Sequence, residues 1–302
     1  MKLFITGGTG SLGTELLAYS RKQGWEATAY SRDEVKQGLL KRVYPEAHFL
    51  LGDVRDEEWL ELAMRGHDVV IHTAAYKQVP AAEVNSNQAV SVNVVGSLNV
   101  VRAAIRAGIH RVVGISTDKA CAPVNCYGAT KMLMEKLFQE ACFWSDTQFT
   151  LVRYGNVLGS RGSVVPFFEE QAKKGLITIT NPKMTRFWLT LDEALSLIFA
   201  AFAETEQGTI LVPKCFASSM AVLAEAVAPG VPTKIIGTRP GEKVHEQLIH
   251  AAEAMHTCDI GALFRIYPAT STFESNLKEG FEYTSDTAPQ LSVEQLREKI
   301  YG

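Results

Sequence analysis

The N-terminal segment carries the feature that most limits how this chain can fold. An apolar strand pattern, Lys2–Thr6, runs into Gly7-Gly8-Thr9-Gly10-Ser11-Leu12-Gly13, in which glycines 7, 10 and 13 follow the spacing GxxGxxG and a helical pattern follows. Such glycines permit a tight turn, close approach of a pyrophosphate to the backbone and close helix–strand packing. The helix N-terminus offers free N–H groups and a positive dipole to phosphates. We therefore predict a dinucleotide site in which Gly7, Thr9, Gly10, Ser11, Leu12 and Gly13 bind the cofactor.

Strand and helix patterns alternate through the first half of the chain. Apolar strand patterns cover residues 2–6, 26–31, 48–51, 68–73, 110–116 and 149–154, and helical patterns between them cover residues 12–23, 57–65, 88–107 and 127–142. This alternation is typical of βαβ units around a parallel sheet. It predicts an α/β fold with a Rossmann-type doubly wound parallel sheet in residues 1–155.

The alternation breaks down beyond residue 155. Residues 155–162 resemble a loop, helices are predicted at 164–174 and 192–203, short strands at 176–179, 209–212 and 234–236, and residues 251–302 are the least periodic. We expect residues 156–302 to form mainly a smaller substrate-binding lobe, with segments at about 184–212 returning to the Rossmann domain. The active site is expected in the cleft between the two parts.

The end of the second strand pattern indicates which dinucleotide is bound. An NAD enzyme usually places a carboxylate there to hold the ribose hydroxyls. This chain has Ser31 and Arg32 first, and the Arg32 guanidinium suits a 2′-phosphate. Asp33 lies slightly beyond the expected position and has a second interpretation, as the N-cap of a helix over residues 34–40. We favour NADP over NAD, with Ser31, Arg32 and Asp33 at the site.

Three other strand ends supply cofactor candidates. Asp53 and Val54 follow the third strand, where the adenine edge is expected, although Asp53 has an alternative role as a turn residue beside Arg55. Ala74 and Ala75 follow the fourth strand, and their small side chains permit close approach of the cofactor. Lys77, further along, suits cofactor or substrate, and we assign it to the cofactor.

Tyr127 and Lys131 are the strongest indication of chemistry. They are four residues apart on a predicted helix, so both lie on one face and the ammonium can approach the phenol. An unperturbed tyrosine has a pKa of about 10, which a neighbouring cation would lower. Tyr127 is then predicted to take a hydroxyl proton while hydride leaves for the nicotinamide. The alternative is a helix with a buried ring and a solvated lysine.

Further motifs narrow the function. They are Lys77-Gln78-Val79-Pro80, Ser116-Thr117-Asp118-Lys119-Ala120, Tyr127-Gly128-Ala129-Thr130-Lys131, Val152-Arg153-Tyr154-Gly155-Asn156-Val157, Gly159-Ser160-Arg161-Gly162-Ser163-Val164-Val165-Pro166, Met184-Thr185-Arg186-Phe187-Trp188 and Arg239-Pro240-Gly241-Glu242-Lys243. Together they resemble the extended short-chain dehydrogenase/reductase superfamily and, within it, the inverting UDP-N-acetylglucosamine 4,6-dehydratases of the polysaccharide biosynthesis protein family. The resemblance covers roughly residues 1–250 and fades beyond residue 251.

The resemblance implies a set of catalytic residues: Thr117, Asp118, Lys119, Tyr127 and Lys131. Hydride would leave sugar C4 as Tyr127 takes the hydroxyl proton, Lys119 would remove the C5 proton, Asp118 would protonate the departing C6 hydroxyl, and hydride would return to C6. Lys119 must be neutral to act as a base, so its pKa has to fall well below about 10.4. Asp118 must carry a proton to act as an acid. A solvent-facing Asp118–Lys119 salt bridge is the alternative.

A uridine diphosphate would need cationic and polar partners in the second half of the chain. Guanidinium groups suit a diphosphate through forked hydrogen bonds. The resemblance implies that the substrate-binding residues are Lys119, Asn156, Arg161, Thr185, Arg186, Arg239 and Glu242, with Glu242 on the ribose and Asn156 on a phosphate or hydroxyl. Taken singly, each arginine has the alternative of being a surface charge.

Composition excludes several other classes. A net charge of −3 gives no reason to expect nucleic acid or an anionic membrane as partner, and no apolar run reaches the ~20 residues of a membrane span. The N-terminus leads into a strand without a signal-peptide cleavage site, so we expect a cytoplasmic protein. The five cysteines lack zinc-site spacing and are expected to be free thiols, with no metal.

The resemblance also implies a homo-oligomer, either a dimer or a hexamer. Two other functions stay open. One is a UDP-hexosamine 4-epimerase, which needs the same cofactor site and Tyr127 but no acid–base pair for elimination. The other is a non-catalytic NADP-binding module, although such modules commonly lose the Tyr/Lys pair.

Overall fold

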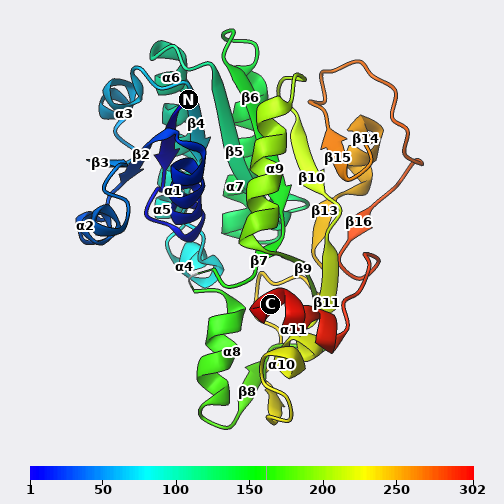
Figure 1. Ribbon diagram of the computed structural model, residues 1–302. Coiled ribbons are helices and arrows are strands. Elements are labelled where there is room, and N and C mark those ends of the chain that lie inside the picture. The colour runs from blue at the N-terminus through cyan, green and yellow to red at the C-terminus, as the bar shows by residue number, and fades with distance from the viewer. Residues whose placement is uncertain (161) are drawn as a thin grey trace.

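The computed structural model describes residues 1–160 and 162–302, and it is built around one large sheet (Figure 1). From one edge to the other, the strands of this sheet are β14 (Thr257–Asp259), β15 (Leu263–Ile266), β10 (Ile210–Pro213), β6 (Gln148–Tyr154), β5 (Arg111–Thr117), β4 (Val69–His72), β1 (Lys2–Thr6), β2 (Glu26–Ser31) and β3 (His48–Leu51).

The pairing pattern of this sheet is that of a doubly wound fold. Every neighbouring pair from β10 to β3 is parallel, whereas β15 is antiparallel to both β10 and β14. The order 3-2-1-4-5-6 reverses direction at β1, and ligands of such sheets bind beyond the carboxyl ends of the strands there. The predicted fold class is confirmed, and each of the first six strands lies within one residue of its predicted bounds.

Helices cover both faces of the sheet. In Figure 1, α1 (Ser11–Gln23) and α9 (Leu191–Ala203) lie in front of it and α7 (Cys126–Ala141) lies behind. Helices α7 and α9 both pack on β5 and β6, and α1 packs beside α9. The other helices of this part are α2 (Glu34–Val43), α3 (Glu57–Met64), α4 (Val79–Val84), α5 (Ser86–Val90) and α6 (Gly96–Arg106).

A π-helical turn, Ser91–Val95, joins α5 to α6 where one helix is predicted. Asn93 in this turn accepts a hydrogen bond from the Tyr76 backbone and donates to the Tyr76 carbonyl and to Thr130. By length and composition the joined helix could span a membrane, but 56% of its apolar window is buried inside the protein. It packs against α3 and α7 as a core helix does.

A second hydrophobic cluster lies at the carboxyl end of the sheet, in the lower part of Figure 1. Its residues come mainly from α8 (Val164–Ala172), α10 (Met220–Val227), α11 (Val293–Tyr301), β8 (Ile177–Ile179) and β9 (Thr185–Leu189). Strand β8 pairs in parallel with β12 (Thr233–Ile235), and β9 forms a small sheet with β7 (Asn156–Val157) and β11 (Phe216–Ser219). Segments at about 184–212 were expected to return to the Rossmann domain. Of these, β9 belongs to the small sheet, whereas α9 packs on the large sheet and β10 is one of its strands.

The C-terminal residues are more closely tied to the large sheet than their weak periodicity suggests. Strands β14 and β15 extend the sheet, and β13 (Gln247–Ile249) pairs with β16 (Tyr283–Thr284). A 3₁₀ segment, Ala251–His256, carries Glu253, which accepts two hydrogen bonds from the buried Arg153 of β6. Arg153 also donates two hydrogen bonds to Glu135 of α7, so this ion-pair cluster joins the tail to the helix that carries Tyr127.

Candidate active site

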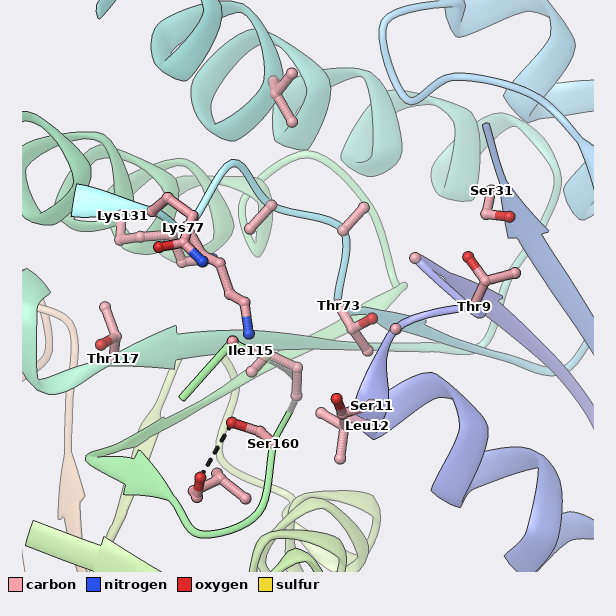
Figure 2. Close-up of a pocket in the computed structure, with 18 of the residues that line it drawn as sticks. Thr9, Ser11, Leu12, Ser31, Thr73, Lys77, Ile115, Thr117, Lys131 and Ser160 are labelled. Atoms are coloured by element: carbon pink, nitrogen blue, oxygen red, sulfur yellow. Dashed lines mark hydrogen bonds between the residues drawn. The ribbon is translucent and has the colours of Figure 1, made fainter. Parts of the chain in front are cut away.

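The glycine turn closes one end of a cavity of about 1100 Å³. Gly7 has φ of +67°, and a Cβ there would lie 2.8 Å from the Ala74 backbone nitrogen. A Cβ on Gly13 would lie 2.6 Å from the Gly8 backbone. Figure 2 shows Thr9, Ser11 and Leu12 on one side of the cavity and Thr117 and Lys131 on the other, with Thr73, Ile115 and Ser160 between them.

Most of the predicted cofactor residues line this cavity. They are Gly7, Thr9, Gly10, Ser11, Leu12, Ser31, Arg32, Asp33, Val54, Ala74, Ala75, Lys77, Tyr127 and Lys131. Gly13 lies outside the lining because it packs α1 against the turn. Asp53 also lies outside it, between the lining residues Gly52 and Val54, and it accepts hydrogen bonds from the Arg55 side chain.

The rim of the first cavity, just beyond the end of β2, carries paired charges. The Arg32 side chain is 58% exposed, and its Nη1 lies 3.5 Å from Asp53 Oδ2. Asp33 is the N-cap of α2, since its Oδ1 accepts from the Lys36 backbone, and it also pairs with the Lys36 ammonium at 2.7 Å. The N-cap interpretation of Asp33 is therefore confirmed, and the same residue lines the cavity.

Several further lining residues were given no role of their own in the sequence prediction, although five of them stand in the quoted motifs. They include Tyr30, Gly52, Thr73, Gln78, Ile115, Ser116, Tyr154, Ser160 and Ser163. Many of them lie at or just beyond the carboxyl end of a parallel strand. Strand ends were a usable signal for this group, because side chains there face the crevice.

Asp118, Lys119 and Tyr127 meet where β5 ends. Strand β5 leads into a 3₁₀ turn, Asp118–Ala120, in which Asp118 is fully buried. Asp118 Oδ1 accepts hydrogen bonds from Thr117 Oγ1 at 2.9 Å and from Lys119 Nζ at 3.0 Å. Gly128 brings α7 against this turn, since a Cβ there would overlap the Lys119 carbonyl oxygen. The Thr117 hydroxyl also lies near the Tyr127 phenol and lowers its pKa.

The protonation of this cluster differs from the sequence expectation. Burial by itself lowers the pKa of Lys119, but the Asp118 and Glu246 carboxylates outweigh it and the pKa is raised. Burial also raises the pKa of Tyr127 to about 12, although the Lys119 charge lowers it. The predicted pKa decreases at Lys119 and Tyr127 are thus wrong for the protein without ligands, because the carboxylates and burial dominate.

Lys131 is the residue of this group that is easily neutralised. Burial lowers its pKa to about 7, against the opposing effect of Glu135. Its amine donates to Met134 Sδ at 2.8 Å. The cation that lowers the pKa of Tyr127 is therefore Lys119 rather than Lys131.

A second cavity, of about 570 Å³, adjoins the first at Lys119, Asn156, Gly162 and Ser163, which line both. Its lining includes the predicted substrate residues Arg186, Arg239 and Glu242, as well as apolar groups such as Phe167, Met184 and Trp188. Thr185 does not line it and bonds His245 and Ser285 instead. Arg161 lies outside the described residues.

The Arg186 guanidinium is held in place by the backbone. It donates to the carbonyl oxygens of Thr185, Val244 and Lys243, and its Nε lies 3.6 Å from Glu246 Oε1. Glu246 lines the second cavity and was not identified from the sequence, where it only follows the quoted Arg239–Lys243 motif.

The structure contains no metal cluster in its described residues, where no group of three or more His, Cys, Asp or Glu side chains could hold an ion. The five cysteines are free thiols, as predicted.

Comparisons with known proteins agree with this geometry. Residues 3–268 match the family described as "Polysaccharide biosynthesis protein". A "UDP-N-acetylglucosamine 4,6-dehydratase (inverting)" of Campylobacter jejuni is 40% identical, over 97% of this chain and 95% of that protein. A "UDP-glucose 4-epimerase" of Rickettsia akari is 39% identical, over 99% of this chain and 94% of its own length. The similarity therefore extends beyond residue 251.

Solved structures give the same fold. The X-ray structure of Pen from Bacillus thuringiensis has a TM-score of 0.92 and 33% identity, covering 98% of this chain and 95% of that chain. The dTDP-glucose 4,6-dehydratase DesIV from Streptomyces venezuelae, solved with NAD, has a TM-score of 0.72 at 20% identity, covering 81% of this chain and 87% of its own.

Proposed function

Because this chain belongs to the polysaccharide biosynthesis protein family, we propose that it is an NADP-dependent UDP-N-acetylglucosamine 4,6-dehydratase that inverts C5. The observation that carries the proposal is the Asp118–Lys119 pair beside Tyr127. Lys119 lines both cavities and Tyr127 lines the first, whereas Asp118 lines neither, is fully buried and accepts a hydrogen bond from Lys119. A 4-epimerase needs no such pair, because it removes and returns hydrogen at one carbon.

The first cavity fits a nicotinamide dinucleotide. The glycine turn, whose tight packing excludes any Cβ at Gly7, suits the pyrophosphate, and Arg32 at the exposed rim suits a 2′-phosphate. Ala74, Ala75 and Lys77 would lie along the cofactor, with Tyr127 and Lys131 at its nicotinamide end. When bound, NADP⁺ would supply the hydride acceptor for C4, the hydride donor for C6 and a positive charge beside the phenol.

Asp118 and Lys119 would form the acid and the base of the elimination by exchanging one proton. Transfer of a proton from Lys119 Nζ to Asp118 Oδ1, along the 3.0 Å hydrogen bond, leaves a neutral amine beside a neutral carboxylic acid. The amine then takes the C5 proton, and the acid gives its proton to the C6 oxygen, which departs as water. The ammonium and carboxylate are regenerated, so the raised pKa of Lys119 describes the resting pair. Return of hydride to C6 would leave an enolate, which would take a solvent proton at C5 on the face opposite Lys119.

Tyr127 would accept the proton of the C4 hydroxyl. Its phenol lies within the field of Lys119 and near the Thr117 hydroxyl, and both lower its pKa against the effects of burial and of Asp118. The charge of the bound nicotinamide would lower it further. Thr117, which donates its hydroxyl hydrogen to Asp118 Oδ1, would orient that carboxyl group.

The second cavity would hold the UDP moiety. Arg186 and Arg239 would pair with the diphosphate, Glu242 with the ribose, and Asn156 with a phosphate or hydroxyl at the junction. Residues 1–155 thus would mainly bind the cofactor and residues 156–302 the sugar nucleotide.

Inversion at C5 rests on Lys119. In retaining sugar dehydratases the third residue of the triplet Thr117-Asp118-Lys119 is typically glutamate, whereas this chain resembles the inverting members in having lysine there.

The second candidate function is a UDP-hexose or UDP-hexosamine 4-epimerase, which the similarity to the Rickettsia akari protein favours.

Incubation with UDP-N-acetylglucosamine in deuterated water tests the proposal. We expect a product that has lost one water, carries solvent deuterium at C5 and has inverted C5 configuration by NMR. A product of unchanged mass, formed as the 4-epimer, would contradict the dehydratase and establish the epimerase.

A further inference from the structure

Glu246 is a buried carboxylate that the proposed steps do not use. It is 3% exposed, and its Oε1 lies 3.5 Å from Lys119 Nζ and 3.6 Å from Arg186 Nε. Its Oε2 has no hydrogen-bond partner among the described residues. Glu246 therefore faces positive charge through Oε1. One of the two cations there is the Lys119 ammonium, which also donates a hydrogen bond to Asp118 Oδ1.

The backbone of Glu246 is fixed to the framework that carries Arg186. The Glu246 nitrogen donates to Ser285 Oγ at 2.9 Å, and the Ser285 nitrogen donates to the Glu246 carbonyl at 2.8 Å. Ser285 Oγ in turn bonds Thr185 Oγ1 at 2.6 Å, next to Arg186. Glu246 is thus anchored to β9 and the C-terminal segment, whereas Lys119 belongs to the end of β5.

We propose that Glu246 is a positioning residue, which holds the Lys119 ammonium at the junction of the two cavities and keeps the proton shared by Lys119 and Asp118 on that pair. This inference rests on the proposed dehydration. The charged and titratable groups around the pair are Glu246 and Arg186, from the side of β9 and the C-terminal segment, Tyr127, from α7, and the Cys215 thiol, between β10 and β11.

The balance of charge around Lys119 explains why the shared proton stays on the Lys119–Asp118 pair. With Lys119 protonated, two carboxylates face two cations. Loss of the proton to solvent would leave Asp118 and Glu246 against Arg186 alone, and an uncompensated buried charge is strongly unfavourable. Glu246 also raises the pKa of Lys119, as its proximity requires. Transfer within the pair keeps the total charge unchanged and avoids this cost.

The test compares Glu246→Gln and Glu246→Asp by the pH dependence of water loss from UDP-N-acetylglucosamine. The active cluster carries one shared proton, so the alkaline limb of kcat reports its loss. We expect Glu246→Gln to move this limb to lower pH by about one unit, since a negative charge is removed. Glu246→Asp keeps the charge, so its limb should stay in place while kcat falls on the order of tenfold through misplacement of Lys119.

Glu282→Gln is a matched control. Glu282 is exposed and lies directly before β16, and a glutamine there can still accept the hydrogen bond from Gln247. We expect its pH profile and kcat to match the wild type. NADP affinity and Tm identify any variant that is damaged generally, and Glu246→Asp remains informative if Glu246→Gln does not fold.

The inference is overturned if folded Glu246→Gln keeps the wild-type alkaline limb, or if Glu246→Asp keeps the wild-type kcat. Failure of the proposed function gives a different result, because the wild-type protein would then release an isomer of its substrate with no loss of water.

Discussion

Lys119 Nζ lies 3.0 Å from Asp118 Oδ1 in a site from which Asp118 has no access to water. The two side chains come from consecutive residues of one 3₁₀ turn, and the position of the flexible Lys119 side chain depends on its contacts with Asp118 and Glu246. An acid and a base that share one proton at this distance can act together in a single elimination.

Replacement of Asp118 by Asn should separate water loss from the first hydride transfer. The amide cannot protonate the departing C6 hydroxyl, so we expect water loss to slow by roughly 10²–10⁴-fold. Oxidation at C4 relies on Tyr127 and should continue, so reduced nicotinamide should accumulate in a single turnover, measured by its absorbance.

Tyr127→Phe provides the comparison, because it removes the base for the earlier step. No reduced nicotinamide should accumulate, whereas NADP binding should be nearly intact. Wild-type rates of water loss in Asp118→Asn would remove Asp118 from the mechanism.

Gly7→Ala should destabilise the protein more than Gly24→Ala. Both glycines have nearly the same left-handed backbone conformation, with φ of +67° and +65°. The conformational cost of an added Cβ is therefore about the same at both positions. At Gly7 the Cβ also meets the Ala74 backbone at 2.8 Å, whereas at Gly24 it meets nothing within 4 Å.

Urea unfolding of the two alanine variants measures this difference. We expect Gly7→Ala to lose an additional ~1–3 kcal/mol, the usual cost of forcing extra atoms into a packed site, and to bind NADP more weakly. Equal losses of stability would show that the backbone conformation alone requires glycine at position 7.

Arg32→Ala should reduce the preference for NADP. A charge-assisted hydrogen bond to a 2′-phosphate contributes about 1.5–3 kcal/mol, so the Kd for NADP should rise roughly tenfold or more. The Kd for NAD, which has no 2′-phosphate, should change little, as titration calorimetry with both dinucleotides would show. An equal rise in the Kd for NADP and the Kd for NAD would show that Arg32 does not recognise the 2′-phosphate.

The sequence predicts the parallel sheet well because each of its strands has a local signal. A buried parallel strand is a continuous apolar run, and the glycine turn identifies β1 and α1 by itself. Strands β11, β13 and β16 escaped prediction because they have only two to four residues, and these strands and β9 pair with segments distant in the chain. The contact of Glu246 with Lys119 depends on these pairings and has no counterpart in local spacing.

Protonation states were the least predictable part of the site. The spacing of Tyr127 and Lys131 places them on one face of α7, but spacing contains no information about burial. Burial raises the pKa of Tyr127 to about 12 and lowers that of Lys131 to about 7, and the nearby cation that matters for Tyr127 is Lys119. Such effects follow from the packing of α7 on β5 and β6, which exists only in the folded chain.

Lys131 should make the stability of the cofactor-free protein depend on pH. It is 3% exposed, and burial lowers its pKa from 10.5 to about 7. Between these values the unfolded chain binds a proton that the folded protein does not. The stability associated with neutral Lys131 is therefore present above 10.5 and is lost as the pH falls toward about 7, by at most about 1.4 kcal/mol per pH unit.

Lys131→Met isolates this contribution. In urea unfolding at pH values from about 10 down to about 7, the variant should gain stability relative to the wild type, because it has no group to protonate on unfolding. Lys136→Met, at an exposed position of the same helix, should give a difference that does not vary with pH. Since other titrating groups are common to both proteins, they cancel in each difference. A Lys131→Met difference that is as flat as that of Lys136→Met would show that Lys131 stays charged in the folded protein.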